Sequence, residues 1–130
     1  MRDSHKAIDR LRELCLSFPE ATEKMFGGHT TPTWRVRDKI FAQFEDGHHE
    51  DGRPALWCKA PLGAQDVLVG SHPKRFFVPP YVGQNGWVGV WLDVPVDWEI
   101  VAGLVADSYR MTAPKRLVAA LDAGGQLGDG

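Results

Sequence analysis

The sequence has little of what marks a membrane or secreted protein. No apolar run approaches the roughly 20 residues that a membrane span needs. The polar N-terminus, Met1–Lys6, leads straight into an amphipathic pattern and does not resemble a signal peptide. Only two residues are cysteine, Cys15 and Cys58. Both lie in apolar patterns, which favours reduced, buried thiols, with a disulfide or a nucleophile as the less favoured alternative. We therefore expect a cytoplasmic protein without a membrane partner.

Catalytic motifs are also missing. Gly27-Gly28 lacks the strand–loop–helix context and the Lys-Ser/Thr of a phosphate-binding loop, and no GxSxG, HExxH or CxxC pattern occurs. His48-His49-Glu50-Asp51 contains metal-ligating residue types, but neighbouring residues in a Gly-flanked loop do not converge on an ion. We expect no metal site, no cofactor and no catalytic residues. An enzyme whose active site assembles from distant residues stays possible.

Size and composition indicate one globular domain. The chain has 130 residues, of which 43% are apolar and 25% charged. That length can bury a core without disulfides. We expect one domain over residues 1–130, with its core in about 4–122 and a disordered tail at 123–130. The formal net charge of −2 argues against tight, non-specific binding of nucleic acid.

Apolar periodicity predicts the secondary structure. The predicted helices are 4–17, 63–71, one that follows Asp97 as its N-cap, and a short one from Pro114 that Gly124-Gly125 stop. The predicted strands are 34–36, 40–44, 55–60, 76–78 and 87–92, and a weaker strand pattern lies around 25–28. Asp38-Lys39 would be the turn of a hairpin, 83–86 a flexible turn, and Gly89 a bulge or a close approach.

This order predicts an α+β fold. Strands joined by short turns favour an antiparallel sheet, here of about five strands. The N- and C-terminal helices would cover one of its faces, which gives a two-layer sandwich.

Two sets of residues are candidates for binding. Basic residues gather at Arg35, Arg37 and Lys39, at Lys74 and Arg75, and at Lys115 and Arg116. They could form one basic face, although solvated charge on separate faces is the simpler interpretation. Tyr81 and Trp87 flank a turn rich in Pro and Gly. They could line a site for a small molecule or peptide, although packing that anchors the turn is the simpler role.

Several stretches together resemble one known family. They are Phe18-Pro19-Glu20-Ala21, Lys39-Ile40-Phe41-Ala42, Lys59-Ala60-Pro61, Arg75-Phe76-Phe77-Val78-Pro79-Pro80-Tyr81, Gly86-Trp87-Val88-Gly89-Val90, Ser108-Tyr109-Arg110 and Ala113-Pro114-Lys115-Arg116-Leu117. The chain resembles the MmcQ/YjbR-like family of small bacterial proteins over roughly residues 5–121.

The resemblance implies a CyaY-like fold and a DNA-binding role through wing-like β-loops. Lys59, Arg75, Lys115 and Arg116 match the basic residues of the family pattern, and Arg35, Arg37 and Lys39 could form a wing tip. Gln84 and Asn85 would reach base edges. Duplex DNA is thus the expected partner of a protein taken as a monomer by default. A small-molecule or peptide-binding module is the alternative, and an enzyme is less favoured.

Overall fold

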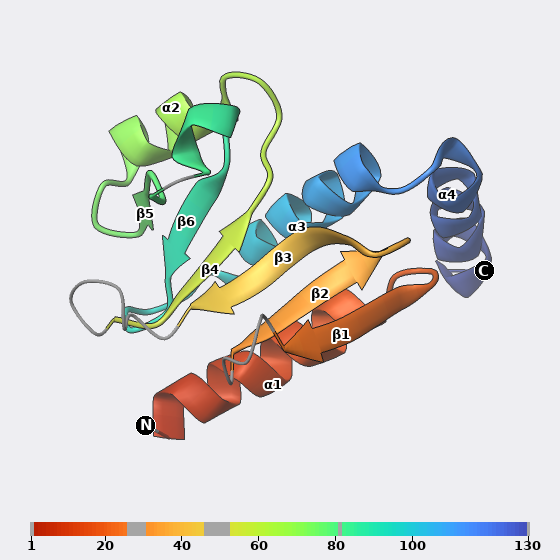
Figure 1. Ribbon diagram of the computed structural model, residues 1–130, viewed down its shortest axis with the longest axis horizontal. Coiled ribbons are helices and arrows are strands. Elements are labelled where there is room, and N and C mark those ends of the chain that lie inside the picture. Colours follow the sequence, from red (N-terminus) through yellow and green to blue (C-terminus); the bar gives the residue numbers. More distant parts are fainter. Residues whose placement is uncertain (1, 26–30, 46–52, 81, 130) are drawn as a thin grey trace.

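The computed structural model describes residues 2–25, 31–45, 53–80 and 82–129. These residues form an α+β fold around one antiparallel sheet of six strands (Figure 1). The helices are α1 (Arg2–Leu16), α2 (Ala64–Ser71), α3 (Trp98–Thr112) and α4 (Lys115–Asp129), with a 3₁₀ turn at Gly83–Asn85. The strands are β1 (Ala21–Met25), β2 (Pro32–Val36), β3 (Lys39–Glu45), β4 (Ala55–Cys58), β5 (Phe76–Phe77) and β6 (Val88–Trp91).

The strands lie in the order β1-β2-β3-β4-β6-β5. The first four are neighbours in chain order, as a meander requires, and β6 then pairs with both β4 and β5. The antiparallel α+β class predicted from the sequence is therefore confirmed. The predicted number of about five strands is one short, because β1 was not placed at Ala21–Met25.

Helices α1 and α3 pack side by side on one face of this sheet (Figure 1). Phe18, just after α1, stacks on Tyr109 of α3 with ring centroids 4.8 Å apart. Tyr109 and Phe41 of β3 meet edge to face, with ring centroids 5.4 Å apart. These three rings join both helices to the middle of the sheet, and Tyr109 and Phe41 are fully buried.

Ser108 fixes α3 against two strands. Its hydroxyl accepts a 2.9 Å hydrogen bond from the main-chain N–H of Lys59 and donates one to the carbonyl oxygen of Phe41. A buried hydroxyl needs such partners, since an unmet donor or acceptor costs about 1–3 kcal/mol. The contact sets the end of β4, and with it Lys59, next to β3.

The β2–β3 hairpin turns at Arg37 and Asp38, with φ of 51° and 65°. Val36 pairs with Lys39, so the turn is one residue earlier than the predicted Asp38-Lys39. Two-residue hairpin turns favour positive φ at both central residues because this matches the twist of the strands. The consequence is that Lys39 belongs to β3 and has a fixed register.

Three other local predictions can be compared with the structure. Asp97 caps α3 as predicted, since its carboxylate accepts from the N–H groups of Glu99 and Ile100 at 3.1 and 3.4 Å. Helix α4 continues to Asp129, so the prediction that Gly124-Gly125 end it is wrong. A close approach at Gly89 is confirmed, because a Cβ there would lie 2.2 Å from the ring of Phe77.

No helix in the described part of the chain is both long and apolar enough to cross a membrane.

Candidate functional site

Five of the predicted basic residues gather at one end of the sheet. They are Arg37, Lys39, Lys59, Lys115 and Arg116, which we call the basic edge. They come from the β2–β3 turn, the first residue of β3, the residue after β4 and the first turn of α4. Figure 1 shows α4 beside this end of the hairpin.

Lys39 and Lys59 lie near each other at this end of the sheet. Lys39 begins β3, and Lys59 directly follows Cys58, which pairs with Ala42 of β3. Burial lowers the pKa of Lys59, and the nearby positive charge of Lys39 lowers it further. Two like charges so placed favour a bound anion.

Glu20 connects the hairpin to α4. Arg37 Nε donates to Glu20 Oε1 at 2.8 Å, and Arg116 Nη2 lies 4.0 Å from Glu20 Oε2. The hydrogen bond from Arg37 is the main cause that lowers the pKa of Glu20, and the charge of Arg116 adds to it. Thus one carboxylate holds two cations of the basic edge together.

The other three cations of the basic edge have no such partner in the part of the chain that the structure describes. Within the described segments, no acidic side chain forms an ion pair with Lys39, Lys59 or Lys115. Lys39 and Lys115 are exposed and Lys59 is half-buried. The basic edge thus presents more positive charge than its carboxylates neutralise.

Arg35 lies close to the basic edge but points away from it. It precedes the buried Val36 in β2, so its side chain lies on the opposite face of the sheet. There its Nε donates to Thr33 Oγ1 at 3.1 Å, and its Nη1 lies 3.6 Å from Asp38 Oδ1. Arg35 is therefore held by neighbours within the hairpin.

Lys74 and Arg75 lie at the opposite end of the sheet. The carbonyl oxygen of Arg75 accepts from the N–H of Trp91, and Trp91 pairs with Ala55 at the start of β4. Lys59 follows the other end of that strand. The structure therefore does not bring these two residues to the basic edge.

The predicted ligand-binding pair is only partly described. Trp87 is half-buried, and its carbonyl oxygen accepts a hydrogen bond from Gln65 Nε2, which also bonds the carbonyl of Gly83 at 2.8 Å. Tyr81 lies outside the described residues. A binding role for the pair stays a prediction.

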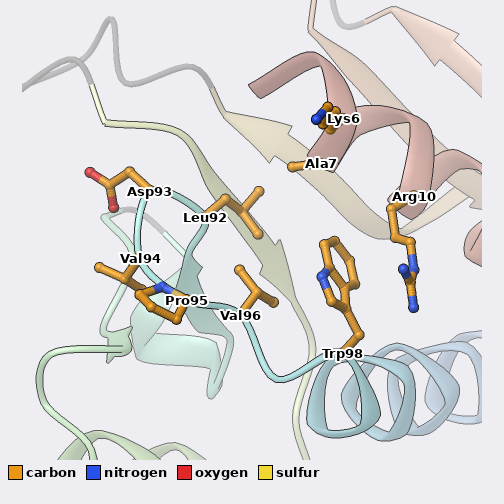
Figure 2. A pocket seen from close by; sticks show the side chains of 9 residues that line it. All are labelled: Lys6, Ala7, Arg10, Leu92, Asp93, Val94, Pro95, Val96 and Trp98. Carbon is orange, nitrogen blue, oxygen red and sulfur yellow. The ribbon is translucent and has the colours of Figure 1, made fainter. Parts of the chain in front are cut away.

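A cleft that the sequence did not indicate lies on the other side of the molecule from α4. It has a volume of about 510 Å³ and is lined by three residues of α1, by residues 92–96 between β6 and α3, and by Trp98. In Figure 2 the indole of Trp98 projects from α3 toward α1, with Arg10 on one side of the ring and Val96 on the other. The guanidinium carbon of Arg10 lies 5.1 Å from the ring centroid.

The only sequence signal for this cleft is the spacing of Lys6 and Arg10. Residues four apart share one face of a helix. Trp98 is far away along the chain, so nothing local in the sequence joins it to α1.

No three His, Cys, Asp or Glu side chains in the described ranges lie close enough together to hold a metal ion. His48-His49-Glu50-Asp51 lies outside those ranges.

The antiparallel sheet and the helices on its face define an α+β protein, a class that serves many unrelated functions. A family model described as YjbR matches residues 16–111, so the chain belongs to the YjbR family. The expected family is thus confirmed. No protein with a curated description matches.

The fold is shared with solved structures, including the following two. Deinococcus radiodurans protein DR2400, with the domain DUF419, is 24% identical, with a TM-score of 0.67 over 78% of this chain and 75% of that one. A protein from Pseudomonas syringae is 17% identical, with a TM-score of 0.59 over 83% of this chain and 97% of that one.

Proposed function

We propose that this protein binds duplex DNA by placing its basic edge against the phosphate backbone. The observation that carries the proposal is the pair Lys39 and Lys59, two neighbouring cations that lack an acidic partner among the described residues. A phosphate group between them would offset their mutual repulsion. Duplex DNA supplies closely spaced phosphates that several lysines and arginines can contact at once.

The shape of the basic edge supports the same proposal. The tight turn at Arg37 and Asp38 makes the hairpin end an exposed tip, and α4 begins beside it with Lys115 and Arg116. A protruding hairpin next to the start of a helix presents cations from two directions. A β-hairpin wing that lies along a DNA groove contacts the phosphates in the same way. Phosphate contacts of this kind set the position on DNA and do not read its sequence.

Within this surface, the carboxylate of Glu20 competes with a DNA phosphate for Arg37. Arg37 and Glu20 are each about half exposed, with side-chain exposures of 44% and 48%. An exposed ion pair contributes at most about 1 kcal/mol, so a phosphate can replace the carboxylate. Because the whole chain carries a net charge of −2, binding depends on local charge and must weaken with salt.

The test is fluorescence anisotropy of a labelled duplex over a range of salt. We expect binding at about 50 mM salt that weakens steeply toward about 200 mM. Lys39→Gln and Lys115→Gln each remove one phosphate contact. Each should weaken binding about tenfold at about 50 mM salt and reduce the salt slope by about one.

Lys74→Gln is the matched control, since it removes the same charge at the opposite end of the sheet. It should leave the affinity almost unchanged. Absence of salt-sensitive binding at low salt would refute a DNA-binding role. Equal weakening by all three variants would instead refute the basic edge as the interface.

A further inference from the structure

The cleft between α1 and the β6–α3 connection combines an apolar floor with a charged rim. Ala7 and Leu92 on its floor are 6% and 4% exposed and belong to the core. Val96 and Trp98 are half-buried and pack against that core. The volume of about 510 Å³ falls in the range of pockets that hold small organic ligands.

The positive charges of the rim have no carboxylate partner among the side chains that the structure describes. Lys6 and Arg10 are exposed and lie one turn apart on α1. Neither forms an ion pair with another described side chain, and the guanidinium group of Arg10 lies over the ring of Trp98. Asp9, between them in sequence, pairs with Arg12 instead.

Among the described residues that line the cleft, the one carboxylate, Asp93, is already paired with a cation. Asp93 receives two hydrogen bonds from Arg53, at 2.7 and 2.8 Å. This two-point contact with Arg53 is the first cause that lowers the pKa of Asp93, so the group is ionised and paired at neutral pH. The remaining charge on the cleft wall is therefore positive.

An aromatic ring, an apolar floor and two cations on one wall together suit one class of ligand. We propose that this cleft binds a small organic anion with a flat apolar body, such as an aromatic carboxylate. The body would lie on Val96 and Leu92 beside Trp98, and its carboxylate would point to Lys6 and Arg10. This site lies apart from the basic edge, so it goes beyond DNA binding and does not depend on it.

The probes are three compounds that share one ring system and differ in charge. They are 2-naphthoate, the neutral 2-naphthylmethanol and the cationic 2-naphthylmethylammonium. Binding to the full ¹⁵N-labelled chain is followed by heteronuclear NMR. We expect 2-naphthoate to shift the signals of α1, of residues 94–96 and of the Trp98 indole N–H. The neutral compound should bind more weakly and the cation least.

Two variants remove one charge each from the cleft rim. Lys6→Met and Arg10→Met keep an apolar stem on an exposed face, so both should fold. Each should weaken 2-naphthoate binding about fivefold, as the loss of one exposed ion pair does. Lys24→Met is the matched control, because Lys24 lies on the sheet face opposite α1 and pairs with Asp38. It should not change the affinity.

Three results would overturn the proposal. The first is no shift at millimolar 2-naphthoate. The second is the same affinity for all three probes, which would indicate an apolar crevice without selection for anions. The third is evidence that the ligand binds elsewhere, either as NMR shifts that gather in another part of the chain or as equal weakening of 2-naphthoate binding by Lys24→Met. None of these outcomes bears on DNA binding by the basic edge.

Discussion

The hydroxyl of Tyr109 donates a 2.7 Å hydrogen bond to the main-chain carbonyl oxygen of Pro19. The bond joins the last turn of α3 to the segment that follows α1. Glu20 is the next residue, with a φ of 58°, and from there its carboxylate reaches Arg37 and Arg116. One buried tyrosine thus links the core to the geometry of the basic edge.

Removal of this hydroxyl should destabilise the protein. Tyr109→Phe keeps the ring that stacks on Phe18 but leaves the carbonyl of Pro19 without its donor. We expect the free energy of unfolding to fall by about 1 kcal/mol. Urea denaturation followed by tryptophan fluorescence measures this change. An unchanged midpoint with an unchanged slope would show that water replaces the hydroxyl without cost.

The same tyrosine should make stability fall at alkaline pH. Burial raises the pKa of Tyr109, and the negative charge of Glu20 raises it further. The folded state therefore favours the neutral phenol. The stabilisation by the neutral phenol is fully present below about pH 10, the pKa of tyrosine in the unfolded chain. It is lost as the pH rises through the higher pKa of Tyr109 in the folded chain. The stability difference between the native chain and Tyr109→Phe should shrink above about pH 10, as urea titrations at several pH values would show.

Gly89 should tolerate no side chain without a rearrangement. A Cβ there would lie 2.2 Å from the ring of Phe77, which itself stacks on Trp91 at 4.0 Å. In Gly89→Ala the ring must leave that stack, at a cost of about 1–3 kcal/mol.

Gly103→Ala is the control for this prediction. Gly103 lies in α3 with nothing within 4 Å of an added Cβ. Alanine favours a helix, so this variant should gain about 0.5–1 kcal/mol. Thermal unfolding of both variants gives the comparison. A stable Gly89→Ala would mean that the stack on Trp91 contributes little.

Neither cysteine should react while the protein is folded. Cys15 and Cys58 are fully buried, and burial raises the pKa of both thiols, that of Cys58 to about 12. The thiolate is the reactive form, so almost none is present at pH 8. A chromogenic disulfide reagent should label both thiols slowly in buffer and at once in denaturant. Rapid labelling of the native protein would contradict this burial.

The elements with clear apolar periodicity could be predicted from the sequence. The stripe of Leu11 and Cys15 defines α1, and Asp97 marks the start of α3 as its cap. Strand β1 gave no such pattern. The inward position at its centre is Glu23, whose carboxylate accepts from Trp34 Nε1 at 2.9 Å and from Arg12 Nε at 2.8 Å. A strand whose inward side chain is charged has no apolar alternation to detect.

The candidate sites depend on contacts that sequence patterns do not contain. Arg37 and Arg116 are far apart in the sequence, and in the structure both lie next to Glu20. The basic clusters look equivalent in the sequence but differ in position, because Lys74 and Arg75 lie at the end of the sheet far from the basic edge. The spacing of residues in the sequence predicts which of them share a face of one helix or strand. Which charges of different elements lie together depends on the order of the strands in the sheet.

Glu20→Gln should strengthen the proposed binding of DNA. The change removes the carboxylate that holds Arg37 and Arg116, and it keeps the size of the side chain. Both guanidinium groups then face a phosphate without a competitor, so we expect the affinity at low salt to rise about three- to tenfold. Glu99→Gln makes the same change in net charge at the start of α3, at the end of that helix away from α4. Anisotropy titrations of both variants separate the local effect from the global one. A similar gain in both would mean that net charge alone controls binding and that Glu20 does not compete with phosphate.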